Sequence, residues 1–217
     1  NNINRFLTFA RILDPKSKLG TFDRLDFYYE KPSFEYQHIL RFMDILEENY
    51  DGYLEHLFQN SGNIVKRNTS VCYFDCTNYY FESEDEDDEY VDEATGEILK
   101  GLRRYGPSKE HRPNPIVQMG LFLDGSGFPL AFSLHPGNTN EQTTLRPLEK
   151  KILQDFALSK FIVCTDAGLS SLENRKFNTI GERAYIVTQS LKRFKAHLQD
   201  WVQEPSGWRR EGEKEYY

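Results

Sequence analysis

Two aspartates, each attached to a run of apolar and aromatic residues, constrain the fold of this chain more than any other feature. Asp75 lies within the run at 71–82, and Asp166 directly follows the run at 161–165. Runs of this length and composition predict strands that are buried on at least one face. A carboxylate placed where such a strand reaches the surface is held in position by the sheet and is well placed to bind a metal ion.

Other roles for the two residues are open at this point. An aspartate after a strand is often a turn or helix-cap residue, and this is the alternative for Asp166. A carboxylate inside an aromatic run needs a partner, so for Asp75 the choice lies between a metal ion and an arginine. The occurrence of both residues in one chain favours the metal.

The predicted elements after residue 70 follow the order strand, strand, strand, helix, strand, helix, strand. This is the order of an α/β fold with a ribonuclease-H-like mixed sheet and flanking helices, in which three antiparallel strands precede parallel strands joined by crossover helices. The first strand and the first parallel strand are then neighbours, so Asp75 and Asp166 would lie side by side. The strands are expected at 71–82, 117–123, 128–135, 161–165 and 184–188, and the helices after capping boxes at Thr139 with Gln142 and Ser170 with Glu173.

The pattern before residue 63 is different. Apolar residues recur at helical spacing at 4–13 and 35–58, and Pro15 and Pro32 interrupt this pattern. We therefore expect a small helical N-terminal region at 1–62 and an α/β core at 63–190 that contains an acidic loop at 82–98. The chain begins with an asparagine rather than Met, so we expect it to be part of a longer polypeptide.

Charge is unevenly distributed along the chain. The net charge of −7 over 217 residues argues against a simple polyanion-binding module. The segment 84–89 is entirely acidic, which predicts a solvated loop because like charges repel. The basic cluster that follows offers contacts to a phosphate backbone, and pairing with the preceding acids is the alternative. The candidate DNA-binding residues of this cluster are Arg103, Arg104, Lys109 and Arg112.

The three cysteines, at 72, 76 and 164, all fall inside predicted strands. There they are expected to pack as small hydrophobic residues in a reducing compartment. The spacing of Cys72 and Cys76 also occurs in zinc half-sites, but no H-x3-5-H partner follows, which disfavours zinc. The sequence holds neither a signal peptide nor an apolar span of about 18 residues, so we expect a cytoplasmic protein without a membrane partner.

Four segments of the core carry motifs that are weak singly and specific together. They read DCTNYYFE at 75–82, GPSKEHRP at 106–113, GLFL, FPL and HPGN between 120 and 138, and TDAGLS at 165–170. In this order they resemble the insertion-sequence DDE transposases of the type whose last acid lies in a Y-x2-R-x3-E-x6-K motif. The resemblance covers roughly residues 70 to 190.

The resemblance implies a DNA transposase catalytic domain that performs metal-dependent phosphodiester hydrolysis at the ends of an insertion sequence and then strand transfer. Asp75 and Asp166 would be catalytic residues and metal ligands for two Mg²⁺ ions about 3.5–4 Å apart, with Mn²⁺ as a substitute. The expected partners are DNA, both transposon ends and target, and a second copy of the chain. The N-terminal region would then serve DNA binding or dimerisation, and no small-molecule substrate is expected.

The chain departs from the family at the third acid. Relatives of this type place a strand-rich insertion before that glutamate, and 191–217 would be the truncated start of it. Arg209 and Glu213 have R-x3-E spacing, but Ser206 stands at the tyrosine position, so we take the match as coincidence. We therefore expect the third catalytic acid to be absent from this chain. A catalytically inactive DNA-binding or assembly module and a metal-dependent nuclease of the same fold are the alternatives.

Overall fold

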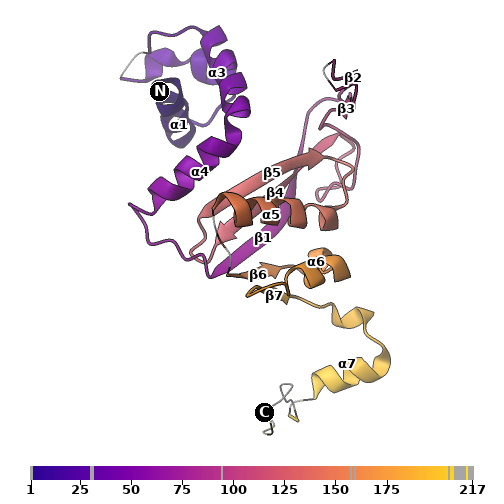
Figure 1. Ribbon diagram of the computed structural model, residues 1–217. Coiled ribbons are helices and arrows are strands. Elements are labelled where there is room, and N and C mark those ends of the chain that lie inside the picture. Colours follow the sequence, from indigo (N-terminus) through magenta and orange to yellow (C-terminus); the bar gives the residue numbers. More distant parts are fainter. Residues whose placement is uncertain are drawn as a thin grey trace. The chain divides into compact units, whose positions relative to one another are not determined.

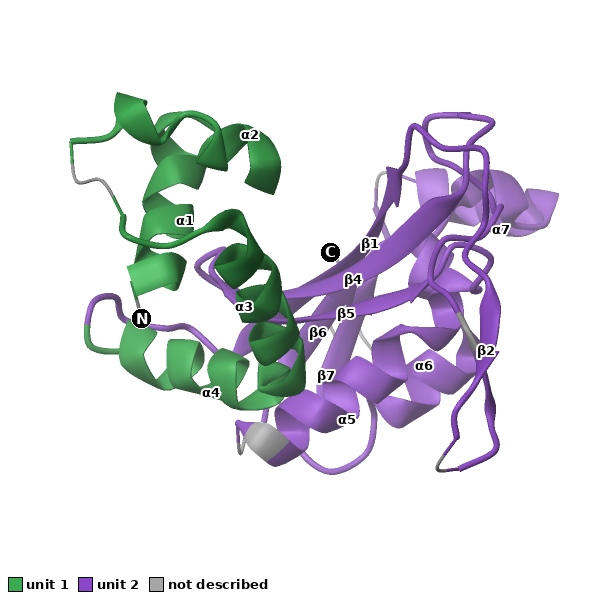
Figure 2. Cartoon of the chain, turned by 90° about the horizontal axis from the view of Figure 1, so that it is seen from above, with its two compact units in different colours: residues 1–63 green, residues 64–217 purple. Residues whose placement is uncertain are grey.

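The computed structural model describes residues 2–29, 32–93, 95–156, 158, 160–204, 206–207 and 214. The chain divides into two compact units, residues 1–63 and 64–217, which Figure 2 colours separately. Each unit has buried apolar residues of its own. Among the helices of the described residues, none combines the length and the apolar character that a bilayer crossing requires.

Unit 1 is helical, as the sequence predicts, and its buried apolar residues are Ala10, Ile39, Phe42 and Leu54. The helical pattern at 35–58 is divided between two helices, because the backbone of Asn49 leaves helical geometry with φ −110° and ψ 18°. The elements are α1 (Asn2–Leu13), α2 (Lys18–Phe22), the 3-10 helix η1 (Leu25–Phe27), α3 (Tyr36–Glu48) and α4 (Tyr50–Ser61).

Unit 2 contains a five-stranded sheet in the order β5-β4-β1-β6-β7 (Figure 1). β4 is antiparallel to both β1 and β5, whereas β6 is parallel to both β1 and β7. This confirms the ribonuclease-H-like mixed sheet with flanking helices. The strands are β1 (Val71–Tyr80), β4 (Ile116–Asp124), β5 (Pro129–Pro136), β6 (Ile162–Thr165) and β7 (Ala184–Val187), and the helices are α5 (Leu145–Asp155), α6 (Leu172–Phe177) and α7 (Ala196–Gln203).

The side chains of β1 alternate between a covered face and an open face of the sheet. Cys72, Phe74 and Cys76 are buried, whereas Tyr73 and Asp75 between them are exposed, which is the alternation expected of a half-buried strand. The Sγ of Cys76 lies 3.2 Å from the Oγ1 of Thr144, the residue that precedes α5, so the buried side chains of β1 face that helix. Asp75 therefore projects from the other face.

The two buried thiols of β1 behave as the sequence predicts for small hydrophobic residues. Burial raises the pKa of Cys72 to about 12 and the pKa of Cys76 to about 11, so both thiols are protonated at neutral pH. Both cysteines are free, and the described residues contain no cluster of three or more potential metal ligands. These observations give no support to the zinc half-site.

Two predicted helix caps are wrong by a few residues. The capping box at Thr139 and Gln142 does not begin a long helix, because the Asn140 side chain accepts a hydrogen bond from the Gln142 N–H at 3.1 Å and directs the chain into the 3-10 helix η2 (Glu141–Thr143). Helix α5 follows only from Leu145. The cap of α6 is Ser171 rather than Ser170.

The described residues after β7 include the 3-10 helix η4 (Leu191–Arg193) and the helix α7. That 191–217 is the start of a strand-rich insertion stays a prediction. Arg209 and Glu213 lie outside the described residues. The boundaries predicted at 62 and 190 stay predictions.

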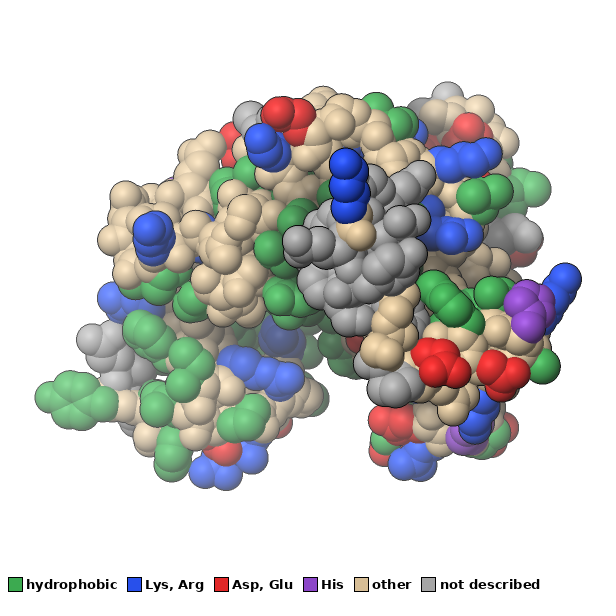
Figure 3. Space-filling view, turned by 90° about the horizontal axis from the view of Figure 1, so that it is seen from below, with side chains coloured by type: hydrophobic (Ala, Val, Ile, Leu, Met, Phe, Trp, Pro, Cys, Tyr) green, Lys and Arg blue, Asp and Glu red, His purple; other side chains and the backbone are tan. Residues whose placement is uncertain are grey.

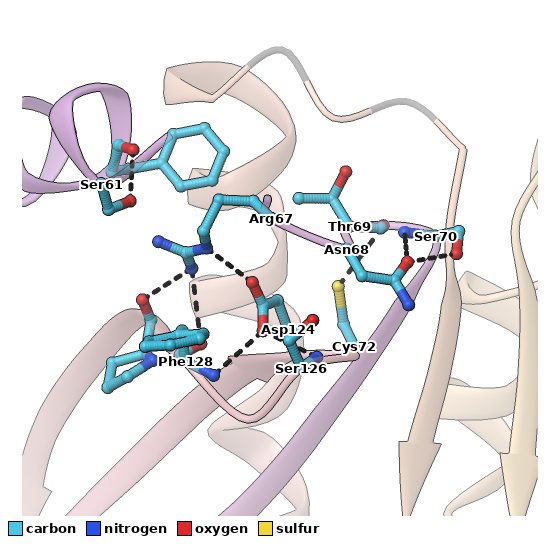
Figure 4. A network of polar contacts seen from close by, with 11 residues as sticks. Ser61, Arg67, Asn68, Thr69, Ser70, Cys72, Asp124, Ser126 and Phe128 are labelled. Carbon is cyan, nitrogen blue, oxygen red and sulfur yellow. Dashed lines mark hydrogen bonds and ion pairs between the residues drawn. The ribbon is translucent and has the colours of Figure 1, made fainter. Parts of the chain in front are cut away.

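A buried ion pair closes the β4–β5 hairpin, as Figure 4 shows. The Nε of Arg67 lies 2.5 Å from the Oδ2 of Asp124, whose side chain is fully buried. The Oδ1 of Asp124 accepts hydrogen bonds from the backbone N–H groups of Ser126 and Phe128, each at 2.9 Å. Burial raises the pKa of Asp124, but the bonds from Arg67, Phe128 and Ser126 outweigh it, and the pKa lies below its ordinary value.

Removing one partner of this pair should destabilise unit 2 strongly. The substitution Arg67→Met leaves the Asp124 carboxylate buried without its cation, and we expect the free energy of unfolding to fall by about 3–5 kcal/mol. The control is Lys160→Met, which breaks the exposed pair between Lys160 and Glu182 and should cost at most about 1 kcal/mol. Urea denaturation followed by circular dichroism measures both. Equal losses in the two variants would contradict this assignment.

Candidate metal and DNA site

The parallel pairing of β1 with β6 runs toward the two predicted aspartates. Val71 pairs with Ile162 and Tyr73 with Cys164, a constant offset of 91 residues. Asp75 and Asp166 differ by the same number and lie two residues beyond the last of these pairs. Because neighbouring strands lie about 4.8 Å apart, a register that continues to them makes the two aspartates neighbours where β6 ends. Their roles as catalytic residues and metal ligands stay predictions.

Each carboxylate is oriented by a backbone N–H group. The Oδ1 of Asp75 accepts a hydrogen bond from the Cys76 N–H at 2.8 Å, and the Oδ1 of Asp166 accepts one from the Leu169 N–H at 3.2 Å. The second bond makes Asp166 the cap of the 3-10 helix η3 (Ala167–Leu169), so the cap role considered as an alternative is present. Among the described residues, neither Oδ2 has a hydrogen-bond partner.

Asp75 is not enclosed by the aromatic run in which it lies and does not need a metal ion or an arginine as a buried carboxylate would, contrary to expectation. Its side chain is 74% exposed, since strict alternation along β1 turns it away from the covered face. An arginine is not its neighbour either; the Nζ of Lys109 lies 3.9 Å from the Oδ1 of Asp75. Asp75 is therefore a hydrated carboxylate beside a lysine rather than one half of a buried pair.

The donor set fits a hard divalent cation. Magnesium prefers oxygen ligands, keeps several waters and is commonly held by one or two carboxylates. Asp75 and Asp166 supply two carboxylates, each fixed through one oxygen with the other available. The described residues contain no third acid, cysteine or histidine that completes a cluster with them.

The motif at 106–113 brings Lys109 to β1 through a tight turn. The hydroxyl of Ser108 accepts hydrogen bonds from the N–H groups of Glu110 and Arg112, each at 3.3 Å, and its carbonyl accepts one from His111. His111 takes the left-handed backbone conformation with φ 55°. The Nζ of Lys109 donates a hydrogen bond to the Cys76 carbonyl, so the lysine is anchored on β1 beside Asp75.

The glycine that begins this motif is required by a close approach of two backbones. A Cβ added to Gly106 would lie 2.0 Å from the Gly137 carbonyl oxygen, which no side chain tolerates. The N–H of Gly137 in turn donates to the Leu102 carbonyl at 3.1 Å. The segment before Lys109 is therefore packed directly against the end of β5.

The four predicted DNA-binding residues fall into two groups. Arg103 and Arg104 pair with acids of the preceding segment, as the alternative interpretation has it. Lys109 lies beside Asp75, and the guanidinium of Arg112 lies 4.8 Å from the centre of the Tyr80 ring at the end of β1. On the face of the molecule shown in Figure 3, Lys and Arg side chains lie interspersed with Asp and Glu side chains.

A hollow of about 560 Å³ adjoins this site, and the sequence analysis did not predict it. Gln118 lines it and is almost fully buried; its Nε2 donates to the Gly137 carbonyl at 3.1 Å, and its Oε1 has no hydrogen-bond partner among the described residues. The sequence signal for this hollow was the presence of a glutamine, Gln118, within the otherwise apolar run at 116–123. The hollow is lined by Pro107, Ser108, Lys109, Gln118, Asn138, Thr139, Asn140, Glu141, Gln142 and Gly168.

A buried polar network behind the Asp166 turn was also missed. Glu149 of α5 is fully buried, and it accepts hydrogen bonds from Asn178 at 3.0 Å and from Arg183 at 3.2 Å. Asn174 of α6 donates to the carbonyls of Leu169 and Gln142, both at 3.0 Å, and so connects the Asp166 turn to η2. The position of Glu149 within the apolar stripe of α5 was the available signal.

Comparison with known proteins gives weak likenesses. No protein-family model matches the chain, and no curated protein matches it. A piggyBac transposase synaptic complex with hairpin DNA is similar at 15% identity and TM-score 0.49, over 94% of this chain and 44% of that one. A Mos1 transposase paired-end complex with left transposon end is similar at 13% identity and TM-score 0.33, over 85% of this chain and 57% of that one.

The chain thus spans about half the length of these solved transposases. A likeness of this degree does not by itself establish a shared activity.

The buried carboxyl of Glu149 should give stability a specific pH dependence. Burial raises its pKa from 4.5 to about 7, so the folded state binds more protons than the unfolded state between these values. The free energy of unfolding should therefore fall as pH rises through this window. Glu149→Gln should reduce this decrease in the free energy of unfolding with pH. Glu173→Gln, on the exposed side of α6, should leave the decrease unchanged. Urea midpoints at pH 5 and pH 8 measure this, and identical slopes in all three proteins would contradict it.

Proposed function

We propose that this chain is the catalytic core of a DNA transposase of the insertion-sequence DDE type. The observation that carries the proposal is the parallel β1–β6 pairing in a ribonuclease-H-like sheet, whose offset of 91 residues, continued beyond Tyr73 and Cys164, would bring Asp75 beside Asp166. The four motif segments at 75–82, 106–113, 120–138 and 165–170 support it. The third acid would come from a part of the protein outside the described residues.

In this proposal Asp75 and Asp166 hold the two divalent cations, Mg²⁺ or Mn²⁺, through the oxygen atoms that make no hydrogen bond to the protein. Bound metal ions supply activation of the attacking oxygen and stabilisation of the leaving oxygen during phosphodiester cleavage and strand transfer. The backbone N–H groups of Cys76 and Leu169 fix the orientation of the two carboxylates before metal and DNA arrive.

Lys109 and Arg112 are the residues that would bind the DNA backbone next to the metal. Lys109 is a compact cation held against the Cys76 carbonyl, and it lies close enough to Asp75 to meet a phosphate bound there. Arg112 stacks on Tyr80, which orients its planar guanidinium while leaving it half exposed. The partners in this proposal are the transposon ends, the target DNA and a second copy of the chain.

A catalytically inactive DNA-binding or assembly module is the second candidate. It is favoured by one observation: the described residues contain no group of three or more potential metal ligands. A metal-dependent nuclease of the same fold differs from both in cleaving DNA without joining strands. A strand-joining assay on the full-length protein separates the three, because only the transposase cleaves a terminal sequence and joins its 3′ end to a second duplex.

Metal binding by this chain tests the two aspartates directly. We expect Mn²⁺ to bind, with at least a tenfold loss of affinity in Asp75→Asn and in Asp166→Asn, because each substitution removes one anionic ligand. Asp200→Asn, on the exposed side of α7, removes the same charge and should leave the affinity unchanged. Isothermal titration calorimetry measures all four proteins. If the two site variants bind Mn²⁺ as the control does, the enzymatic proposal fails.

The lysine of the motif should affect DNA and metal in opposite ways. Lys109→Met removes a cation 3.9 Å from Asp75, so Mn²⁺ affinity should stay the same or rise. Cleavage of terminal DNA by the full-length protein should fall at least tenfold, because the phosphate loses its cation. Lys160→Met serves as the control for both measurements. A parallel loss of metal binding and cleavage would show that Lys109 only supports the fold.

A further inference from the structure

The acidic segment 84–89 folds back onto the start of the basic cluster. A small hairpin of β2 (Glu89–Val91) and β3 (Ile98–Lys100) turns the chain round, and Figure 1 places it beyond the end of the sheet at which β1 and β5 finish. The carboxylate of Asp87 accepts two bonds from Arg103, one from its Nε at 2.5 Å and one from its backbone N–H at 2.8 Å. The Asp87 N–H donates to the Arg103 carbonyl at 3.2 Å.

Arg104 and Tyr105, which follow Arg103, also contact the acidic segment. The Oε2 of Glu86 lies 3.2 Å from the Nη1 of Arg104, and its Oε1 accepts a hydrogen bond from the Tyr105 N–H at 2.6 Å. The Tyr105 hydroxyl donates a hydrogen bond to the Glu84 carbonyl at 2.5 Å. The Oε1 of Glu89 lies 3.9 Å from the Nη2 of Arg104. The N–H groups of Tyr105 and Arg103 lower the pKa of Glu86 and of Asp87 respectively, so both acids are anionic at neutral pH.

These carboxylates occupy the donors that a DNA phosphate would use. A carboxylate and a phosphate both accept paired hydrogen bonds from a guanidinium fork and an adjacent backbone N–H. The side chain of Arg104 is 12% exposed and that of Arg103 is 33% exposed, whereas that of Arg112 is 53% exposed.

The covered and the open arginines lie at the same end of β1. Arg103 lies 5.7 Å from the ring centre of Phe81 and Arg112 lies 4.8 Å from that of Tyr80, and these aromatic residues are consecutive where β1 finishes. DNA that meets Lys109 and Arg112 at this end of the sheet therefore comes near cations that the acidic segment already holds.

We propose that the acidic segment 84–89 is an internal competitor for DNA phosphate that covers Arg103 and Arg104. It limits the DNA-binding surface of the free protein to Lys109 and Arg112, and DNA gains Arg103 and Arg104 only by displacing the acids. The proposal rests on the proposed function, because it takes the phosphate backbone of DNA as the partner. Its consequence is regulation: changes that neutralise or move the segment strengthen DNA binding without touching the metal ligands.

The test compares two variants with the same change in charge. Glu86→Gln with Asp87→Asn removes the two carboxylates that hold the arginines. Glu93→Gln with Glu97→Gln removes two exposed acids of the same loop, neither of which pairs with an arginine among the described residues. Each protein is titrated into a fluorescent DNA duplex of arbitrary sequence, because contacts to phosphate do not depend on sequence. Anisotropy is recorded over a range of salt concentrations.

We expect the first variant to bind DNA at least fivefold more tightly than the second at low salt. Its plot of log K against log salt should be steeper by about 1.8, the value for two added phosphate contacts. Adding Arg103→Met and Arg104→Met should abolish this gain, yet change the wild-type protein little. Equal affinities of the two acid variants, or a gain that survives loss of the arginines, would overturn the proposal.

Two further variants keep the result interpretable. Glu86→Gln alone leaves the Asp87–Arg103 contact intact, so it replaces the double variant if that variant does not fold. We expect it to change the salt slope by about half as much as the double variant. Lys109→Met with Arg112→Met tests the proposed function separately. If that variant binds DNA as wild type does, the proposed DNA surface is wrong; if it binds weakly while the acid variants match each other, only the competitor proposal is wrong.

Discussion

The parallel pairing of β1 with β6 is the constraint on which the candidate site depends. β1 is held along its other edge by β4 through nine paired positions, so β6 adds to a strand that is already fixed. The alternation of side chains in a strand means that a slip of one residue would turn Asp166 to the opposite face from Asp75. In the proposed function this offset of 91 residues continues to Asp75 and Asp166, so that both acids lie on one face and serve the same metal site.

The same alternation divides the chemistry between the two faces of the sheet. On the covered face, thiols and the Phe74–Phe122 ring pair, 4.8 Å apart, exclude water and stabilise the fold. The Glu149 carboxylate on that side is paired with Asn178 and Arg183. On the open face, Asp75 stays hydrated and needs no buried cation. A site for a hydrated divalent ion fits this second face, because magnesium gives up its water reluctantly.

The order of the strands followed from the sequence, because each apolar run is bounded by clear turn residues and the topology has few alternatives. Features set by long-range packing did not follow. Asp124 reads as a turn residue, and nothing in its own segment indicates Arg67, which lies 57 residues earlier. The exposure of Asp75 was misjudged because an aromatic run does not reveal which face of a strand is covered. Arg103 and Arg104 were expected to contact DNA. The β2–β3 hairpin, which brings Glu86 and Asp87 back against them, has strands of only three paired residues, too short to be recognised in the sequence.

The most direct test of the account is paramagnetic broadening of the backbone NMR signals of this chain by substoichiometric Mn²⁺. A bound Mn²⁺ ion broadens nearby amide signals regardless of their separation along the sequence. If Asp75 and Asp166 hold one ion between them, the signals of 74–77 and 165–168 disappear together at the lowest Mn²⁺ concentrations, before those of 84–89. Broadening of the acidic segment alone, or of only one of the two aspartate segments, would contradict the shared site.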